Sequence, residues 1–220
     1  MVTTWKKWCS YLFPLTLETS SSDINPSLAV VLYRGRLQLL SGNAIYSWDD
    51  LYRNFRIAFE MVHIKDKPYH DALVLGLGLG SIPYMLEKHF GCRYAFTAVE
   101  IDEAVADLAN RYSLYRLDSP IDIVTADAQV FVELCDDAYD LIAIDIFQDD
   151  LVPYQFETLE FLQACAALLK PGGMLLFNRL HNHDGNSTPT ERFYQDVFKK
   201  VFPRSKAIDT EGNWVLVGES

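Results

Sequence analysis

The chain has 220 residues, of which 50% are apolar and 22% are charged. These proportions are typical of a single globular domain with a sizeable core, and they exclude an intrinsically disordered chain. The formal net charge of -11 disfavours nucleic acid and anionic membranes as partners, because both are themselves negatively charged. No apolar run reaches the roughly 18 residues that a membrane span needs. We therefore expect a soluble, cytoplasmic protein.

The cysteines and the first residues agree with this interpretation. No C-x-x-C pair occurs among Cys9, Cys92, Cys135 and Cys165, so buried free thiols in a reducing compartment are expected. Lys6 and Lys7 precede an apolar stretch at 8–17 and imitate a secretory signal. Pro14 interrupts that stretch and no cleavage-site pattern follows it. The segment is therefore interpreted as the first structured part of the chain.

Residues 1–48 are predicted to form a β-rich extension of the main domain. A polar loop at 19–26 precedes two short apolar runs between Leu28 and Leu40. The runs are separated by a tight turn that contains Gly35, a pattern typical of a β-hairpin.

A helix is predicted to open the main domain, which spans 49–220. Ser47 and Asp50 form an N-cap signature, and apolar residues follow at helical spacing from Leu51 to Val62. Its aromatic residues are expected to pack on a sheet and not to form a cofactor site. They are Trp48, Tyr52, Phe55 and Phe59.

From residue 71 onward, apolar strand-like runs alternate with helical patterns. Strands are predicted at 72–75, 95–99, 121–124, 141–144 and 174–177, and helices at 82–90, 103–115, 156–169 and from Thr188 to Pro203. Thr188-Pro189-x-Glu191 is a capping box with proline at the first helical position. Two last runs, 207–208 and 214–217, are expected to pair antiparallel. The predicted fold is a doubly wound, mostly parallel, seven-stranded α/β sheet.

A glycine-rich turn follows the first strand of this alternation, with glycines at Gly76, Gly78 and Gly80. Glycine permits a tight turn and the close approach of a ligand. Glu100 ends the second strand, 20 residues beyond Gly80, where a carboxylate can accept hydrogen bonds from a ribose diol. These features predict a nucleoside site at the carboxyl ends of the strands. A dinucleotide fingerprint would have Gly or Ala at Ser81, so NAD is disfavoured.

Carboxylates also follow the third and fourth strands. Asp127, which precedes Ala128, has two interpretations that the residues leave open: it accepts from the amine of a purine, or it caps the next helix. Asp145 is expected at the catalytic rim, where burial and nearby like charge raise a carboxyl pKa toward the range of a general base. Asp149 and Asp150 are further candidates, with a solvated acidic loop as the alternative.

Residues 72–178 resemble spermidine synthases and the wider spermidine-synthase-like group. The G-x-G-x-G spacing of the glycine turn is similar to that of class I S-adenosylmethionine-dependent transferases. The stretch Asp145-x-Phe147-x-x-Asp150-x-Val152-Pro153 is similar to the catalytic loop of the spermidine-synthase-like branch. The N-terminal hairpin, with Gln38 and Tyr46, resembles that family's β-rich extension.

The resemblance implies a class I methyltransferase-like Rossmann fold and an adenosine cofactor. That cofactor would be S-adenosylmethionine, its decarboxylated form or methylthioadenosine. The implied cofactor-binding residues are Gln38, Gly76, Gly78, Gly80, Glu100, Asp127 and Ala128. Asp145, with Asp149 and Asp150, is implied to act on the attacking amine. No metal is implied.

One position departs from the family pattern. Leu79 stands where spermidine synthases have an Asp that contacts the charged tail of decarboxylated S-adenosylmethionine. Because an apolar side chain cannot pair with that ammonium, we expect methyl transfer to a small nucleophile, such as an amine. The alternatives are aminopropyl transfer, as in polyamine synthesis, and a non-catalytic nucleoside-binding protein. A homodimer is compatible with the sequence.

Weaker features follow the fifth strand. Asn178 and Arg179 are candidates for substrate contact. His181, His183 and Asp184 could suggest a metal site. However, the two alternating histidines lie on one short loop without a third ligand nearby in the sequence. We expect a polar loop there.

Overall fold

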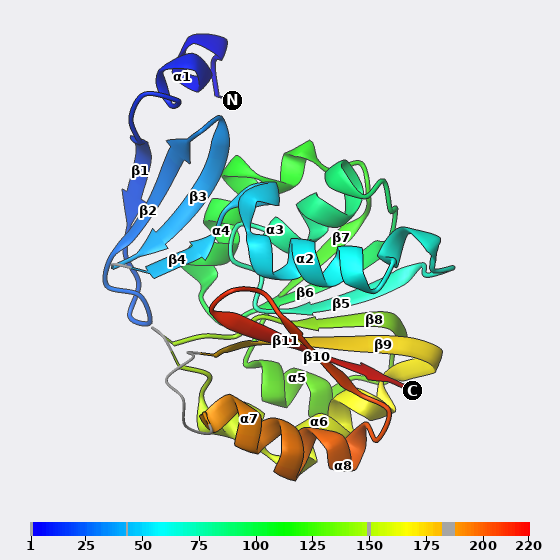
Figure 1. Cartoon of the computed structure of the whole chain (residues 1–220). Coiled ribbons are helices and arrows are strands. Elements are labelled where there is room, and N and C mark those ends of the chain that lie inside the picture. Colours follow the sequence, from blue (N-terminus) through cyan, green and yellow to red (C-terminus); the bar gives the residue numbers. More distant parts are fainter. Residues whose placement is uncertain (1, 43, 149–150, 182–187) are drawn as a thin grey trace.

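The computed structural model describes residues 2–42, 44–148, 151–181 and 188–220. A short helix, α1 (Thr4–Cys9), precedes a small antiparallel sheet (Figure 1). That sheet has the order β1-β2-β3-β4, formed by β1 (Leu15–Ser20), β2 (Leu28–Tyr33), β3 (Arg36–Ser41) and β4 (Ala44–Ser47). The predicted hairpin is confirmed as β2 and β3, and the extension is larger than a hairpin because β1 and β4 flank it.

The main sheet has seven strands in the order β10-β11-β9-β8-β5-β6-β7. Its strands are β5 (Asp71–Leu75), β6 (Ala95–Glu100), β7 (Ile121–Thr125), β8 (Tyr139–Ile144), β9 (Leu169–Leu180), β10 (Lys206–Asp209) and β11 (Asn213–Glu219). Strand β11 runs antiparallel to both of its neighbours, and strands β5 to β9 pair in parallel. The doubly wound prediction is therefore confirmed. Strand β5 is the switch point, because the chain proceeds from it first to β6 and later to β8.

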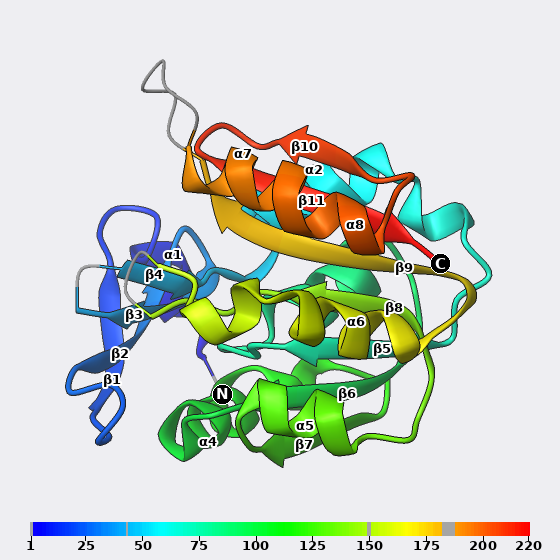
Figure 2. The same ribbon diagram turned by 90° about the horizontal axis from the view of Figure 1, so that it is seen from below.

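Alternate residues of β5 belong to two separate cores. Ala72 and Val74 pack into one hydrophobic cluster, and Leu73 and Leu75 pack into the other. Figures 1 and 2 show the corresponding layers of helices. One face carries α2 (Arg53–Met61), α3 (Ser81–Tyr84) and α4 (Glu103–Tyr112), and the other carries α5 (Ala128–Leu134), α6 (Leu159–Ala167), α7 (Pro189–Phe193) and α8 (Lys199–Val201).

Single helical turns join these elements. They are η1 (Asp49–Leu51), η2 (Ile64–Asp66), η3 (Met85–His89), η4 (Leu114–Arg116), η5 (Tyr154–Glu157) and η6 (Tyr194–Phe198).

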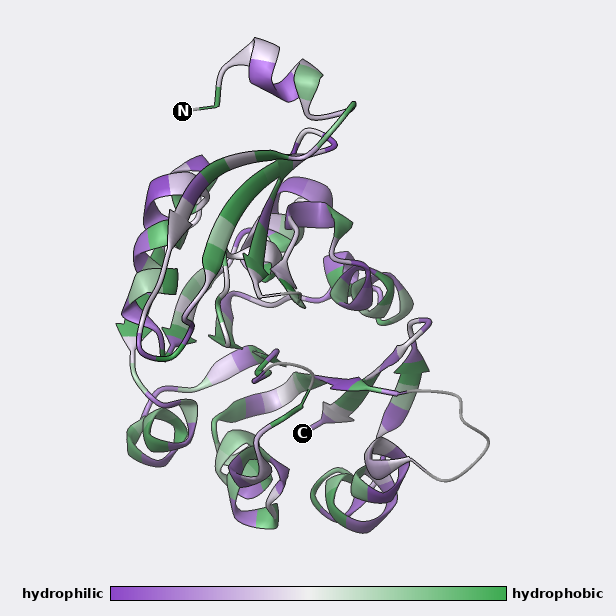
Figure 3. Ribbon diagram, turned by 90° about the vertical axis from the view of Figure 1, so that its left-hand side faces the viewer, coloured by the Kyte–Doolittle hydropathy of each residue, from purple (hydrophilic) through white to green (hydrophobic). Residues whose placement is uncertain are grey.

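The helical ribbons carry both apolar and polar residues, whereas the strands are mostly apolar (Figure 3). The capping box at Thr188 is present as predicted. No helix among the described residues is long and apolar enough to cross a membrane.

The four-stranded sheet shares its core with the main sheet. Leu28 and Leu39 of the small sheet lie in the same hydrophobic cluster as Phe55 of α2 and Val105 of α4. Buried polar contacts add to this packing. The carboxylate of Asp49 accepts hydrogen bonds from the backbone N–H of Leu37 (3.0 Å) and from the Arg116 guanidinium (2.6 and 3.0 Å).

The predicted helix cap at Ser47 is wrong. Ser47 ends β4, where its hydroxyl oxygen accepts a hydrogen bond from the backbone N–H of Leu79 (3.1 Å). Asp50 is occupied by an ion pair with Arg36. Helix α2 begins only at Arg53, and its N-cap residue makes no side-chain capping bond. Both side chains of the predicted cap, Ser47 and Asp50, therefore bind residues that are distant in the sequence and do not cap the helix.

The four cysteines are free, as expected. Only Cys165 is fully buried, and burial raises the pKa of its thiol. The other three are partly exposed, so the expectation of burial was wrong for them.

Removing the Arg116 guanidinium should destabilise the fold. Arg116→Ala leaves the buried Asp49 carboxylate without its cation, a change that costs about 3–5 kcal/mol of unfolding free energy. Urea unfolding measures this loss. Arg111→Ala is the control, because the Arg111–Glu18 pair is exposed and exposed pairs contribute below about 1 kcal/mol. Equal losses in the two variants would contradict a structural role for the Asp49–Arg116 pair.

Candidate functional site

Two strand ends touch directly at the switch point of the main sheet. Gly76, which follows β5, has a φ of 89°, and a Cβ built on it would lie 2.2 Å from the carbonyl oxygen of Asp145. The Asp145 N–H in turn donates to the carbonyl of Leu75 (2.8 Å). Only glycine fits here, because any side chain would collide with the backbone that follows β8.

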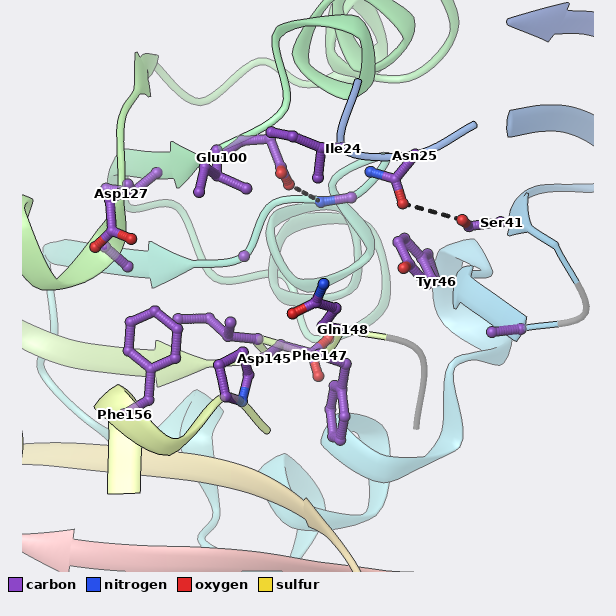
Figure 4. Close-up of a pocket in the computed structure, with 18 of the residues that line it drawn as sticks. Ile24, Asn25, Ser41, Tyr46, Glu100, Asp127, Asp145, Phe147, Gln148 and Phe156 are labelled. Carbon is purple, nitrogen blue, oxygen red and sulfur yellow. Dashed lines mark hydrogen bonds between the residues drawn. The ribbon is translucent and has the colours of Figure 1, made fainter. Parts of the chain in front are cut away.

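A cavity of about 1020 Å³ opens above this contact, at the carboxyl ends of the parallel strands. It is lined by the glycine turn, by the ends of β6, β7 and β8, and by the small N-terminal sheet (Figure 4). The lining includes Asp23, Ile24, Asn25, Ser41, Tyr46, Tyr52, Asn54, Gly76, Gly78, Glu100, Ile101, Asp127, Ala128, Asp145, Phe147, Gln148, Gln155 and Asn213. The predicted nucleoside and amine residues thus largely face one space.

Glu100 is held at the end of β6 by backbone donors. Its carboxylate accepts from the N–H groups of Leu77 and Gly78 (both 3.2 Å) and of Asp102 (3.1 Å). Burial raises its pKa, and the three hydrogen bonds only partly offset this effect. A carboxylate offers about four acceptor sites, so roughly one site stays available for a ligand hydroxyl. Two ribose bonds would require one backbone bond to lengthen.

Asp127 caps a helix, as one of the two interpretations of the sequence predicted, and it also lines the cavity. One carboxylate oxygen caps α5 by accepting from the N–H groups of Gln129 (2.7 Å) and Val130 (3.3 Å). The other oxygen accepts from the Gln155 side chain (2.9 Å) and lies at the cavity. This second oxygen retains the capacity to accept from a purine amine. Ala128, the next residue, also lines the cavity.

Asp145 sits in a cluster of uncharged donors. Its carboxylate accepts from the Tyr52 hydroxyl (3.1 Å) and from the Asn178 amide (2.9 Å). Asn213 fixes that amide by donating to the Asn178 carbonyl oxygen (3.0 Å). Burial raises the pKa of Asp145 to about 6, although the bonds from Asn178 and Tyr52 lower it in part. Burial and the Asp145 charge keep the pKa of Tyr52 well above its usual value, so Tyr52 remains a protonated donor.

The charged groups around the cavity all have the same sign. Asp23, Glu100, Asp127 and Asp145 are acidic, and no Lys, Arg or His occurs among the described residues that line it. Two partly buried carboxyls, Glu100 and Asp145, are bonded only to neutral donors. Their charge is therefore available to a cationic ligand.

Two of the predicted cofactor contacts, Gln38 and Gly80, do not line the cavity. Gln38 is buried within β3, and Gly80 is the N-cap residue of α3, where a Cβ would meet Leu114 at 2.7 Å. Leu79, the position that departs from the family pattern, is 1% exposed and packs in the core. Gly78 and Gly80 adopt positive φ on either side of it, and its N–H is bound by Ser47.

The remaining predicted residues either lie outside the described part of the chain or do not line the cavity. Asp149 and Asp150 lie outside the described residues, as do His183 and Asp184. His181 is buried and stacks on Trp214 at 4.0 Å. Arg179 is buried, pairs with Glu157 and lies over the Phe193 ring, so it does not line the cavity. No metal-binding group of three or more ligands occurs among the described residues.

Sequence reasoning missed Tyr52 and the N-terminal loop. Tyr52 was assigned to helix packing with its aromatic neighbours, but its hydroxyl reaches Asp145, 93 positions away. Phe55 and Phe59 do pack in the core as expected. The loop that contains Ile24 and Asn25 had only a polar composition as its signal. No local sequence pattern could have placed Tyr52 or this loop at the cavity.

Comparison with known proteins agrees with this geometry. Residues 73–177 match a methyltransferase domain family. The polyamine aminopropyltransferase of Vibrio vulnificus is 30% identical over 66% of this chain and 48% of its own length. The chain thus spans about half of that relative.

Solved structures extend the match to most of the chain. The spermidine synthase of Thermotoga maritima has a TM-score of 0.69 at 21% identity and covers 93% of this chain and 72% of its own. Human methyltransferase-like protein 13, determined in complex with SAH, has a TM-score of 0.58 at 25% identity over 77% of each chain. The fold is that of class I methyltransferases. Within this class the chain is similar in sequence to a polyamine aminopropyltransferase and in fold to a spermidine synthase.

The raised pKa of Asp145 has a consequence for stability. A carboxyl whose pKa is higher in the folded state stabilises the fold while it is protonated, and this contribution is lost as pH rises through about 6. Asp145→Asn removes the buried charge and keeps an acceptor for Tyr52. It should therefore be more stable than the wild type by up to about 3 kcal/mol at pH 7.5, and by little near pH 4.

Urea unfolding at both pH values tests this expectation. Asp140→Asn is the matched control on β8. Burial acts to raise the pKa of Asp140, but backbone N–H donors and Lys170 lower it overall. Removing the Asp140 charge should therefore destabilise the protein at pH 7.5. A destabilised Asp145→Asn at that pH would contradict the charge argument.

Proposed function

We propose that the cavity binds S-adenosylmethionine and that the protein transfers the methyl group to an amine nitrogen held at Asp145. The observation that carries this proposal is the contact between Gly76 and the Asp145 backbone. It brings a buried carboxylate with a pKa of about 6 next to a glycine turn, inside a cavity without cationic lining among its described residues.

The lining fits an adenosine cofactor. Glu100 would accept from a ribose hydroxyl, and Asp127 would accept from the adenine amine. Gly76 and Gly78 leave room where side chains would stand. The acidic lining favours a sulfonium cation and an amine over anionic ligands.

The cofactor, when bound, supplies an electrophilic methyl group on a positively charged sulfur. Asp145 would accept a hydrogen bond from the amine and orient its lone pair. It would also take up the proton that the nitrogen loses on methylation and release it to solvent. Tyr52 and Asn178 hold the carboxylate in place throughout. A pKa near 6 suits this role at neutral pH, because the carboxylate is then mostly ionised.

Aminopropyl transfer is the second candidate, and the Vibrio relative favours it. It would require a group that pairs with the terminal ammonium of the decarboxylated cofactor. The glycine turn provides no such group, because Leu79 is apolar and buried. We therefore rank methyl transfer first.

Two substitutions should separate cofactor binding from chemistry. Glu100→Gln weakens a bond made in the ground state, so the Kd for S-adenosylmethionine should rise about tenfold. Asp145→Asn removes the base, so turnover should fall by roughly 10²–10⁴ while the Kd barely changes. Isothermal titration and single-turnover rates measure both effects. The opposite pattern would mean that the two residues have been assigned to the wrong roles.

The cofactor itself distinguishes the two reactions. With a panel of small amines, label from S-[methyl-³H]adenosylmethionine should appear in the amine, and decarboxylated S-adenosylmethionine with putrescine should give no spermidine. Spermidine formation at ordinary enzymatic rates would establish the second candidate instead. Nucleoside binding without transfer to any amine would support a non-catalytic binding protein.

A further inference from the structure

The loop between β1 and β2, residues 21–27, forms a wall of the cavity although it belongs to the N-terminal sheet. Asp23, Ile24, Asn25 and Pro26 all line the cavity. Ile24 is 49% exposed, an unusual position for a large apolar side chain beside a polar site. Figure 4 shows Ile24 and Asn25 on the same side of the cavity as Glu100, across from Asp145.

Buried hydrogen bonds hold this loop in place. One carboxylate oxygen of Asp102 accepts from the Ser22 hydroxyl (2.5 Å) and from the Asn25 amide (2.6 Å). The side-chain carbonyl oxygen of Asn25 accepts a hydrogen bond from the Ser41 hydroxyl of β3 (3.0 Å). Asn25 is 7% exposed and Asp102 is 2% exposed. The loop is thus fixed at its centre, although its outer residues face solvent and the cavity.

The same anchor connects directly to the predicted ribose site. The backbone N–H of Asp102 donates to Glu100 (3.1 Å), and its second carboxylate oxygen caps α4 at Ala104 (2.9 Å). Asp102 therefore joins three parts of the molecule: the end of β6, the start of α4 and the N-terminal loop. The loop and Glu100 thus share Asp102 as a hydrogen-bond partner.

We propose that Ile24 is a cofactor-binding residue that covers the apolar face of the nucleoside, and that Asn25 and Asp102 are the positioning residues that hold it there. This inference rests on the proposed function, because it takes the occupant to be an adenosine derivative. Glu100 satisfies the polar edge of the ribose, and Ile24, beside it, buries carbon surface that would otherwise face water. The exposed isoleucine becomes covered only when the ligand is present.

A double-mutant cycle tests the link between contact and anchor. The Kd of 5′-methylthioadenosine is measured by titration calorimetry for the wild type, Ile24→Ala, Asn25→Ala and the double variant. Each single variant should raise the Kd about fivefold, the first by losing apolar contact and the second by releasing the loop. The double variant should resemble either single one, because an unanchored loop has lost its contact already.

Controls separate this effect from a general loss of structure. Ser21→Ala changes an exposed residue of the same loop that does not line the cavity, and should alter the Kd less than about twofold. Ser22→Ala removes the bond that the hydroxyl donates to Asp102 and the bond that it accepts from the Asn25 N–H (2.8 Å), but it keeps the Asn25 side chain. It replaces Asn25→Ala in the cycle if that variant fails to fold.

The outcomes are distinguishable from those of the proposed function. If the wild type binds neither methylthioadenosine nor S-adenosylmethionine, both proposals are wrong. If it binds but Ile24→Ala leaves the Kd unchanged, only the present inference is overturned. It is also overturned if the two substitutions multiply to about twenty-five-fold in the double variant, because the anchor would then act independently of Ile24.

Discussion

The close approach of Gly76 to the Asp145 backbone is the constraint on which the rest of the site depends. A Cβ at position 76 would stand 2.2 Å from the Asp145 carbonyl oxygen, so the two strand ends can meet only through glycine. Because β5 lies between β6 and β8, this contact joins the Glu100 side of the cavity to the Asp145 side. Loss of the glycine would move apart the proposed cofactor site and the proposed base.

The site holds negative charge without neutralising it. Asp49 of η1 is buried and paired with Arg116, whereas Asp145 and Glu100 are partly buried and bonded to neutral donors only. Burial raises the pKa of both cavity carboxyls, which is the electrostatic cost of leaving them without a cation. A bound sulfonium or ammonium group would lower that cost. The charge of these two carboxylates therefore favours a cationic ligand over an anionic one.

The sequence predicted features that depend on nearby residues. The strands of the main sheet follow from their apolar runs, and the Thr188 cap follows from side chains three residues apart. Features that depend on distant residues were not predictable. Ser47 has the local pattern of a cap, yet it binds Leu79, 32 positions away. Tyr52 has the pattern of a core aromatic, yet its hydroxyl meets Asp145 because α2 packs across the sheet.

The position of Leu79 changes how reaction selectivity must be understood. Sequence resemblance suggests that this side chain faces the cofactor tail, but its N–H is bound by Ser47 and its side chain is buried. An aspartate introduced there would bury an unpaired charge in the core, so it would destabilise the fold before it could reach a ligand. The turn therefore offers no partner for the ammonium of a decarboxylated cofactor, and any such partner must come from residues that do line the cavity. The small N-terminal sheet supplies some of these residues, such as Tyr46 and Ser41.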